Sequence, residues 1–123
     1  MKIYGLDHVL IAMPPQQEEK ARAFYGKVLG LTEVSKPPDL AKRGGVWFEQ
    51  DALKLHLGIE SDFRPAQKAH PALLVEGLTD LANRCRQFGY TVTVDNLLLG
   101  YNRFYIEDPF GNRLELLEPI TTS

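Results

Sequence analysis

Apolar and polar residues follow two different periods along the first half of the chain. Ala21, Phe24, Tyr25 and Val28 recur at the three- to four-residue spacing of a helix with one buried face. Shorter apolar runs on either side of this helix carry the alternation or the branched and aromatic residues of strands. Prolines and glycines separate these segments. The pattern predicts, in order, a strand at 6–12, a helix at 16–28 and strands at 31–35, 46–49 and 53–59.

The second half repeats this order after a polar linker at residues 60–69. The predicted elements are a strand at 70–75, a helix at 78–88 and strands at 91–94, 104–106 and 114–116. Equivalent positions keep nearly the same offset: 59 residues from Gly30 to Gly89 and from His56 to Glu115, and 62 from His8 to His70. Chance similarity is the alternative, but strand order, helix ends and polar positions agree together. We therefore interpret the chain as an internal duplication, with modules at about 1–60 and 69–119.

The last predicted hairpin carries a carboxylate that needs an explanation. Residues 108–112, Asp-Pro-Phe-Gly-Asn, have turn chemistry, because proline presets φ and glycine and asparagine tolerate positive φ. In the strand that follows, Leu114 and Leu116 face one way and Glu115 faces the other. The same alternation sets His56 opposite the leucines that flank it. A charged group on a covered sheet face is costly unless something pairs with it.

Composition and charge exclude several classes of function. A net charge of −2 gives no electrostatic footprint for nucleic acid. No apolar run reaches the length of a membrane span, and the first residues lack the pattern of a signal peptide. A single cysteine, Cys85, excludes an internal disulfide and suits a reducing compartment. These features predict one soluble, cytoplasmic domain that binds neither nucleic acid nor membrane.

Three histidines and one glutamate fall at repeat-equivalent positions on predicted strands: His8, His56, His70 and Glu115. Taken singly, a strand histidine is more often structural than a ligand, and a lone glutamate is usually solvated. Taken together, imidazole nitrogens and a carboxylate match what borderline divalent metals prefer. His8, His70 and Glu115 have the composition of the two-histidine, one-carboxylate triad that leaves metal positions open. We therefore predict that the four side chains hold one divalent metal ion (Zn, Ni, Mn, Fe or Co).

The chain resembles the vicinal oxygen chelate superfamily, which includes glyoxalase I, bleomycin-resistance proteins, fosfomycin-resistance thiol transferases and extradiol dioxygenases. The resemblance rests on LDHVLIAM, ARAFYGKVLGL, LHL, AHPALLV and FYIEDPFGNRLELLEP, which together span nearly the whole chain. It implies an α+β fold in one glyoxalase-like domain at 1–123. Two βαβββ modules would form an open, U-shaped, mostly antiparallel sheet with helices on its outer face.

The resemblance also has implications for the site and the assembly. His8, His70 and Glu115 fall on the usual ligand positions of the superfamily, and His56 falls where glyoxalase I carries a glutamate. Small members usually dimerise, so a homodimer with sites shared between two chains is expected. Ala12 stands where glyoxalase I carries an arginine for glutathione. Leu10 stands where the fosfomycin enzymes carry a threonine. The resemblance therefore does not select one activity.

Other candidate contacts surround the four polar positions. Tyr105 is a candidate catalytic residue, because its hydroxyl could stabilise a developing oxyanion; a packing role is the alternative. The fosfomycin enzymes share a tyrosine at this position. Arg103 and Tyr101 are candidates for binding an anionic group of the substrate. Trp47 and Phe48 alternate on a strand, so one should stack on a ligand while the other packs on a helix. Cys85 lies on an apolar helix stripe and is expected in the core.

Two functions remain open from the sequence. The first is a metal-dependent enzyme that chelates two adjacent oxygens of a small substrate, with lyase or isomerase chemistry favoured over thiol transfer or oxygenation. In isomerase chemistry Glu115 could act as the base, a role that the resemblance implies. The alternative is a metal-free protein that sequesters a drug or metabolite, as bleomycin-resistance proteins do.

Overall fold

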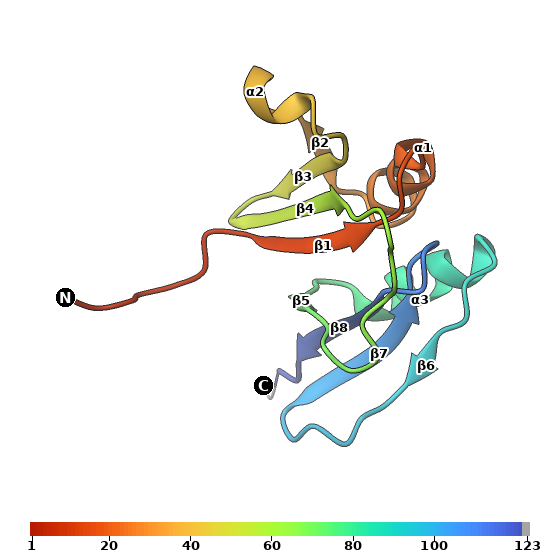
Figure 1. Cartoon of the computed structure of the whole chain (residues 1–123). Coiled ribbons are helices and arrows are strands. Elements are labelled where there is room, and N and C mark those ends of the chain that lie inside the picture. The colour runs from red at the N-terminus through yellow and green to blue at the C-terminus, as the bar shows by residue number, and fades with distance from the viewer. Residues whose placement is uncertain (122–123) are drawn as a thin grey trace. The chain divides into compact units, whose positions relative to one another are not determined.

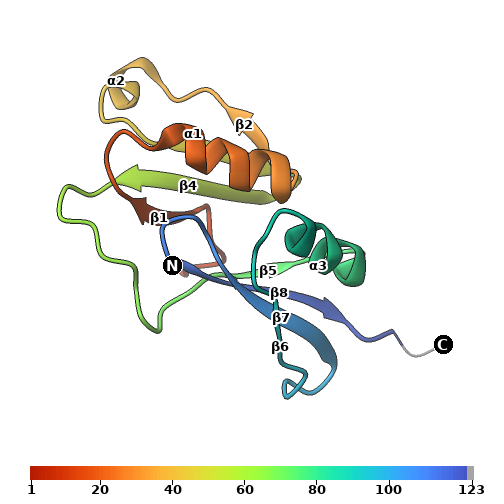
Figure 2. The same ribbon diagram turned by 90° about the vertical axis from the view of Figure 1, so that its right-hand side faces the viewer.

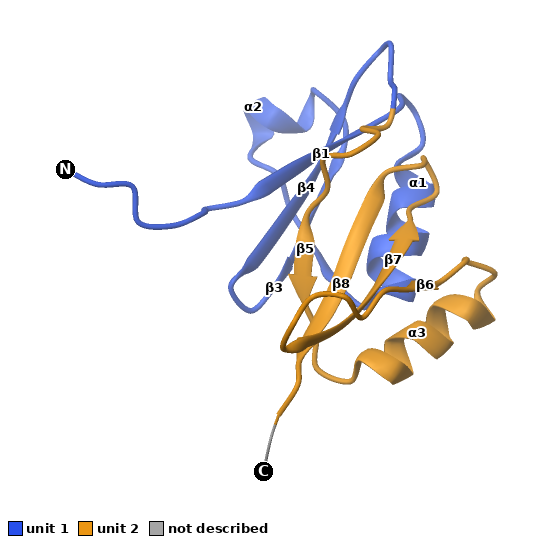
Figure 3. Ribbon diagram, turned by 90° about the horizontal axis from the view of Figure 1, so that it is seen from below, with its two compact units in different colours: residues 1–64 blue, residues 65–123 orange. Residues whose placement is uncertain are grey.

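The computed structural model describes residues 1–121, and the chain divides into two compact units, 1–64 and 65–123 (Figure 3). Each unit contains one four-stranded sheet and its own helical segment. No helix in the described part of the chain is both long enough and apolar enough to cross a membrane. The two units are described in turn.

The first unit is a βαβββ arrangement (Figure 1). Its elements are β1 (Val9–Met13), α1 (Glu18–Ala21), η1 (Arg22–Val28), β2 (Thr32–Val34), α2 (Pro38–Ala41), β3 (Val46–Gln50) and β4 (Leu53–Ile59). The sheet order is β1-β4-β3-β2, with β1 parallel to β4 and the other pairs antiparallel. The chain before β1 extends away from this sheet (Figure 1).

The core of the first unit lies between the helix and one face of its sheet. Phe24 and Tyr25 are completely buried, and the Tyr25 ring lies 5.7 Å from the ring of Phe48 on β3. Leu55 and Leu57 on β4 are also completely buried. The apolar spacing found in the sequence therefore forms the helix face that covers the sheet, where η1 contacts β2 and β3. Figure 2 shows this helix lengthwise beside the sheet.

The second unit repeats the same topology. Its elements are β5 (Ala72–Leu74), α3 (Leu78–Gln87), β6 (Thr93–Val94), β7 (Tyr101–Glu107) and β8 (Arg113–Pro119). The sheet order is β5-β8-β7-β6, with β5 parallel to β8 and the other pairs antiparallel. The order matches that of the first unit strand for strand. The predicted α+β fold built from two βαβββ modules is confirmed.

Helix α3 covers one face of the second sheet. Cys85 is completely buried on the apolar stripe of this helix, which contacts β7 and β8. Phe104, Leu114 and Leu116 supply the opposing apolar face. Glu118, on β8, accepts hydrogen bonds from the backbone N–H groups that begin α3, and so ties the start of the helix to the sheet.

The turn between β7 and β8 is held by its aspartate. Asp108 is buried, and its Oδ1 accepts the backbone N–H groups of Phe110 (2.9 Å) and Asn112 (2.8 Å). The Asn112 side-chain amide donates to Asp108 Oδ2 at 2.9 Å. Gly111 has φ +89°, a conformation that side chains resist. The turn chemistry of the sequence thus fixes the register of the hairpin.

Three details differ from the sequence predictions. His8 and His70 lie just before β1 and β5, not on strands. Pro71 follows His70 and has no N–H to extend a ladder, while residues 1–8 are exposed and form no strand. The predicted helix continues from α1 into the π-helix η1, in which Leu29 N–H bonds the Phe24 carbonyl. The segment between the predicted strands at 31–35 and 46–49 contains the one-turn helix α2.

Candidate functional site

The hairpin register gathers several predicted site residues on one face of the second sheet. Glu115 lies opposite Tyr105, and Arg103 occupies the next position on the same face of β7. His70 precedes β5, which is parallel to β8, and the Glu115 backbone N–H donates to the Pro71 carbonyl at 3.1 Å. Glu115 is buried, although it lies on the sheet face opposite Leu114 and Leu116.

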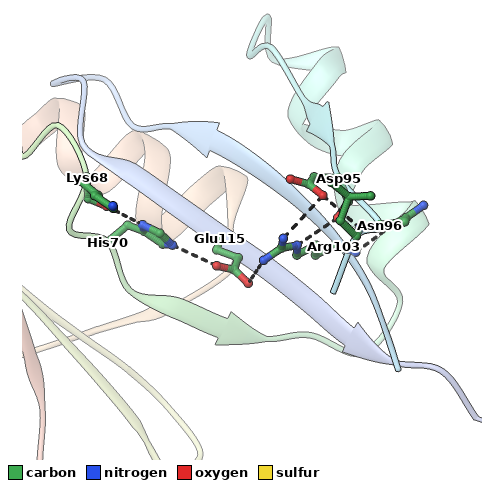
Figure 4. Close-up of polar contacts among 7 residues, drawn as sticks. Lys68, His70, Asp95, Asn96, Arg103 and Glu115 are labelled. Atoms are coloured by element: carbon green, nitrogen blue, oxygen red, sulfur yellow. Dashed lines mark hydrogen bonds and ion pairs between the residues drawn. The ribbon is translucent and has the colours of Figure 1, made fainter. Parts of the chain in front are cut away.

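His70 and Glu115 are in direct contact. The distance from His70 Nε2 to Glu115 Oε1 is 2.9 Å, and His70 Nδ1 lies 2.7 Å from the Lys68 carbonyl oxygen (Figure 4). A carbonyl only accepts hydrogen bonds, so Nδ1 carries a proton. In neutral His70 the lone pair is then on Nε2 and faces a carboxylate. The contact needs either a second proton on the ring or a cation shared by the two groups.

Arg103 holds the other oxygen of Glu115. Its Nη1 donates to Glu115 Oε2 at 3.2 Å, its Nε donates to the Asp95 carbonyl at 3.0 Å, and its Nη2 lies 3.5 Å from Asp95 Oδ1 (Figure 4). Burial raises the pKa of Glu115, but the hydrogen bonds from His70 and Arg103 outweigh it, so the net pKa lies below its ordinary value. Glu115 is therefore ionised at neutral pH.

These contacts add a positioning role to Arg103, whose predicted contact with the substrate stays a prediction. The sequence suggested that it binds an anionic substrate, whereas its guanidinium here contacts Glu115 and Asp95. Such a guanidinium positions the carboxylate. Sequence reasoning missed the partners Asp95 and Lys68. The proximity of Arg103 and Glu115 was available from the hairpin register, but the loop that carries Asp95 gave no comparable signal.

Tyr105 lies at the centre of this face. Its ring makes an edge contact with His70, with centroids 5.5 Å apart and planes at 83°. The Arg113 guanidinium carbon lies 4.0 Å from the ring centroid. A cavity of about 520 Å³ in this unit is lined by Tyr105 and Arg113 among other residues. The predicted contact Tyr101 begins β7, opposite Pro119.

The histidines of the first unit form a stack of rings. The His56 imidazole lies on the Trp47 indole, with centroids 3.9 Å apart and an interplanar angle of 4°. His8 covers the other side of His56, with centroids 4.4 Å apart and an angle of 22°. Burial, then the nearby His8, lowers the pKa of His56, so it is neutral at pH 7. Trp47 faces this stack, while Phe48 packs under the helix.

The structure thus gathers the four predicted ligands as two pairs, His8 with His56 and His70 with Glu115. Within each unit, as far as residue 121, no group of three or more His, Cys, Asp or Glu side chains is arranged to hold a metal ion. Imidazoles coordinate through lone pairs in the ring plane. The stacked faces of His8 and His56 are therefore a packing contact, and His8 Nδ1 lies 2.9 Å from Asp7 Oδ1.

The His70–Glu115 pair suits a metal better. A metal-binding histidine usually donates its other ring N–H to a carbonyl or carboxylate, and a ligating carboxylate is itself hydrogen-bonded. His70 meets the first condition through Lys68 and Glu115 the second through Arg103. The donor set of this pair fits a divalent cation.

Comparisons with known proteins agree with this architecture. A Bacillus anthracis protein assigned to the glyoxalase family is 42% identical over 98% of each chain, with a TM-score of 0.94. A lactoylglutathione lyase from Agrobacterium tumefaciens is 24% identical (89% of this chain, 91% of the other, TM-score 0.67). A fosfomycin resistance protein from Listeria monocytogenes is 15% identical (97% and 96%, TM-score 0.76). The last two show the fold alone.

No curated protein matches the chain by sequence. The family model for the Glyoxalase/Bleomycin resistance protein/Dioxygenase superfamily matches residues 5–116, which is most of the chain. The resemblance found in the sequence is confirmed. The chain is a member of the Glyoxalase/Bleomycin resistance protein/Dioxygenase superfamily.

Proposed function

We propose that this protein is a metal-dependent enzyme that acts on a small, oxygen-rich substrate by lyase or isomerase chemistry. The observation that carries the proposal is the His70–Glu115 contact, in which an imidazole fixed by the Lys68 carbonyl presents Nε2 to an ionised carboxylate. A divalent cation bound there would polarise substrate oxygens as a Lewis acid. Membership in the superfamily supports this class of reaction, which includes oxygen-chelating enzymes.

The residues of the second unit take distinct roles in this proposal. His70 and Glu115 are the metal ligands, and Lys68 fixes the tautomer of the imidazole through its carbonyl. Arg103 occupies one oxygen of Glu115 and leaves the oxygen near His70 for the cation. The Tyr105 hydroxyl donates a hydrogen bond to a substrate oxygen on which charge develops. Glu115 as a proton-accepting base stays a prediction.

His8 and His56 stay predicted ligands, and His56 is held neutral, the protonation state that coordination needs. To act as ligands they would have to leave their ring-on-ring contact, because the lone pairs of an imidazole lie in the ring plane. Trp47, Tyr101 and Arg103 stay predicted substrate contacts.

Metal content tests the proposal directly. Protein purified without a histidine tag is analysed by mass spectrometry of its metals, alongside His70→Ala and Glu115→Gln. We expect close to one equivalent of a divalent metal in the natural chain and loss in both variants. Glu107→Gln, an exposed carboxylate on the same hairpin, is the matched control and should keep the metal. Unchanged metal content in both site variants contradicts the assignment.

A second function, metal-free binding of a small molecule, is favoured by one observation. A doubly protonated His70 would satisfy both of its contacts without any metal. Bleomycin resistance proteins belong to the same superfamily. This second function is supported if the purified protein carries less than about a tenth of an equivalent of metal and if added Ni, Zn, Mn or Fe(II) does not raise its stability against unfolding. A metal that binds the folded protein would raise that stability.

We also propose that the chain works as a homodimer, with sites shared between two chains. Residues 1–6 support this, because Met1, Ile3, Tyr4 and Leu6 are all more than 85% exposed. Apolar surface of this kind marks interaction sites in soluble proteins. Deleting residues 2–6 should shift the sedimentation coefficient from dimer to monomer at micromolar concentration. A natural chain that sediments as a monomer at every concentration contradicts the proposal.

A further inference from the structure

We infer that a pocket in the first unit binds a small organic anion with a flat apolar body. The pocket has a volume of about 480 Å³, within the range of small-molecule sites, and every residue that lines it lies between 8 and 60. The inference rests on the proposed function only in taking this anion to be the substrate. Binding itself requires no metal.

The walls of the pocket select a flat ligand. Trp47 and His56 stack with their planes 4° apart and His8 covers the other side of His56, so the aromatic surface of the pocket is the indole face that His56 leaves uncovered, together with the ring edges. Leu10 and Leu40 add apolar wall, and Leu10 is 61% exposed in this structure. A planar group that packs against the aromatic surface buries apolar area on both partners, and offset stacking adds to that burial.

The charges around the pocket select an anion. Lys36 and Arg43 line it, against one carboxylate, Glu60. The Lys36 ammonium donates to the Gly44 carbonyl and lies 5.9 Å from the Trp47 ring centroid. Through its side chain Arg43 makes no ion pair or hydrogen bond with any residue from 1 to 121. A free guanidinium beside an apolar wall is suited to a carboxylate, sulfonate or phosphonate.

The loop that carries these cations is anchored. The Gly45 N–H donates to Glu18 Oε2 at 3.2 Å. A Cβ on Gly45 would lie 2.2 Å from the Leu57 carbonyl oxygen, so the loop approaches β4 as closely as a backbone can. Together with the Lys36–Gly44 contact, this holds the Lys36 ammonium and the backbone that carries Arg43 at the pocket before any ligand arrives. Such preorganisation lowers the entropic cost of binding.

Trp47 provides the assay, because it is the single tryptophan of the chain. The full-length protein, as purified and after chelator treatment, is titrated with phenylphosphonate, benzyl alcohol and benzylamine while Trp47 fluorescence is recorded. We expect saturable quenching by phenylphosphonate, with a dissociation constant on the order of 1 mM, the range for a ligand of this size. Benzyl alcohol should bind at least about tenfold more weakly and benzylamine not measurably.

Charge variants separate the pocket from the overall charge of the protein. Arg43→Gln should weaken phenylphosphonate binding by about five- to tenfold, the size of one charge-assisted contact. Arg64→Gln is the matched control, because it removes the same charge from an exposed residue outside the pocket, and it should leave binding unchanged. Isothermal calorimetry on the same proteins verifies each constant independently of fluorescence.

The inference is overturned if benzylamine or benzyl alcohol binds as tightly as phenylphosphonate. It is also overturned if calorimetry and fluorescence detect no binding, or if both arginine variants behave alike. Its failure is distinct from failure of the proposed function. Metal retained without anion binding removes only the pocket assignment, whereas anion binding by a protein that never carries metal removes only the enzyme proposal.

Discussion

Replacing Glu115 with glutamine tests the central contact of the second unit without changing its shape. The carboxylate lies 2.9 Å from His70 Nε2, a contact that needs a second ring proton when no metal is bound, and it accepts from Arg103 at 3.2 Å. It is only 6% exposed. A glutamine that keeps its oxygen toward Arg103 turns its amide N–H₂ toward His70 Nε2, which can accept it only after the ring has given up its second proton. Glu115→Gln therefore breaks at least one charge-assisted hydrogen bond in a place where water cannot replace it.

The expected cost is about 2–3 kcal/mol of unfolding free energy at pH 7, the value of one hydrogen bond to a buried charged group. It stays below the 3–5 kcal/mol or so that follows when a buried charge loses its only partner. Arg103 keeps Asp95 in the variant, through the 3.0 Å bond to the carbonyl and the 3.5 Å contact to Oδ1. No charge is left wholly uncompensated.

The difference between the two proteins should depend on pH with a definite sign. The pKa of Glu115 in the folded chain lies below the ordinary value of 4.5. The unfolded chain therefore binds a proton first as the pH falls, so the carboxylate's contribution is complete above pH 4.5 and is lost below it. The difference in unfolding free energy between the two proteins should have its full value at pH 7. It should shrink as the pH falls through the pKa of Glu115 in the folded chain.

Urea unfolding followed by circular dichroism, in chelator so that metal does not contribute, measures this difference at pH 7 and at steps down to about pH 3. Glu107→Gln serves as the control, since it removes one exposed carboxylate from the same hairpin. Equal stability of Glu115→Gln and the natural chain at pH 7 refutes the reasoning. A difference that stays constant across the whole pH range also refutes it.

Three further substitutions test the fold and the site. Gly45→Ala should destabilise the first unit by more than about 3 kcal/mol in urea unfolding, because φ is +84° and the new Cβ meets the Leu57 carbonyl oxygen at 2.2 Å. Glu118→Ala should lower the melting temperature by about 2–5 °C, because the start of α3 loses its charged cap. Tyr105→Phe should keep metal and lie within about 0.5 kcal/mol of the natural stability in urea unfolding, while the turnover of a substrate falls by about a hundredfold.

Matched controls accompany the first two of these variants. Gly26→Ala, where the nearest atom would lie 3.7 Å from the new Cβ, should be tolerated. Glu76→Ala removes an exposed carboxylate beside the start of α3 and should leave the melting temperature unchanged. A stable Gly45→Ala, a normal Glu118→Ala or a metal-free Tyr105→Phe each contradicts its own prediction.

The sequence by itself determined the elements and their order. A helix with one apolar stripe and strands with alternating side chains have periods that are local properties of the chain, so each module could be derived without any partner. The Asp108 turn and the glycines at the helix ends placed the boundaries. Alternation along β8 and β4 also placed Glu115 and His56 opposite the leucines of the core.

Tertiary structure decided what those polar residues touch. The Lys68 carbonyl fixes the His70 tautomer, Asp95 holds Arg103 from a loop, and His8 stacks on His56 although 48 residues separate them. Side-chain periodicity states which face a residue occupies, but it contains no information about ring orientation or loop conformation. Those depend on contacts between segments distant in sequence, which only the folded chain brings together.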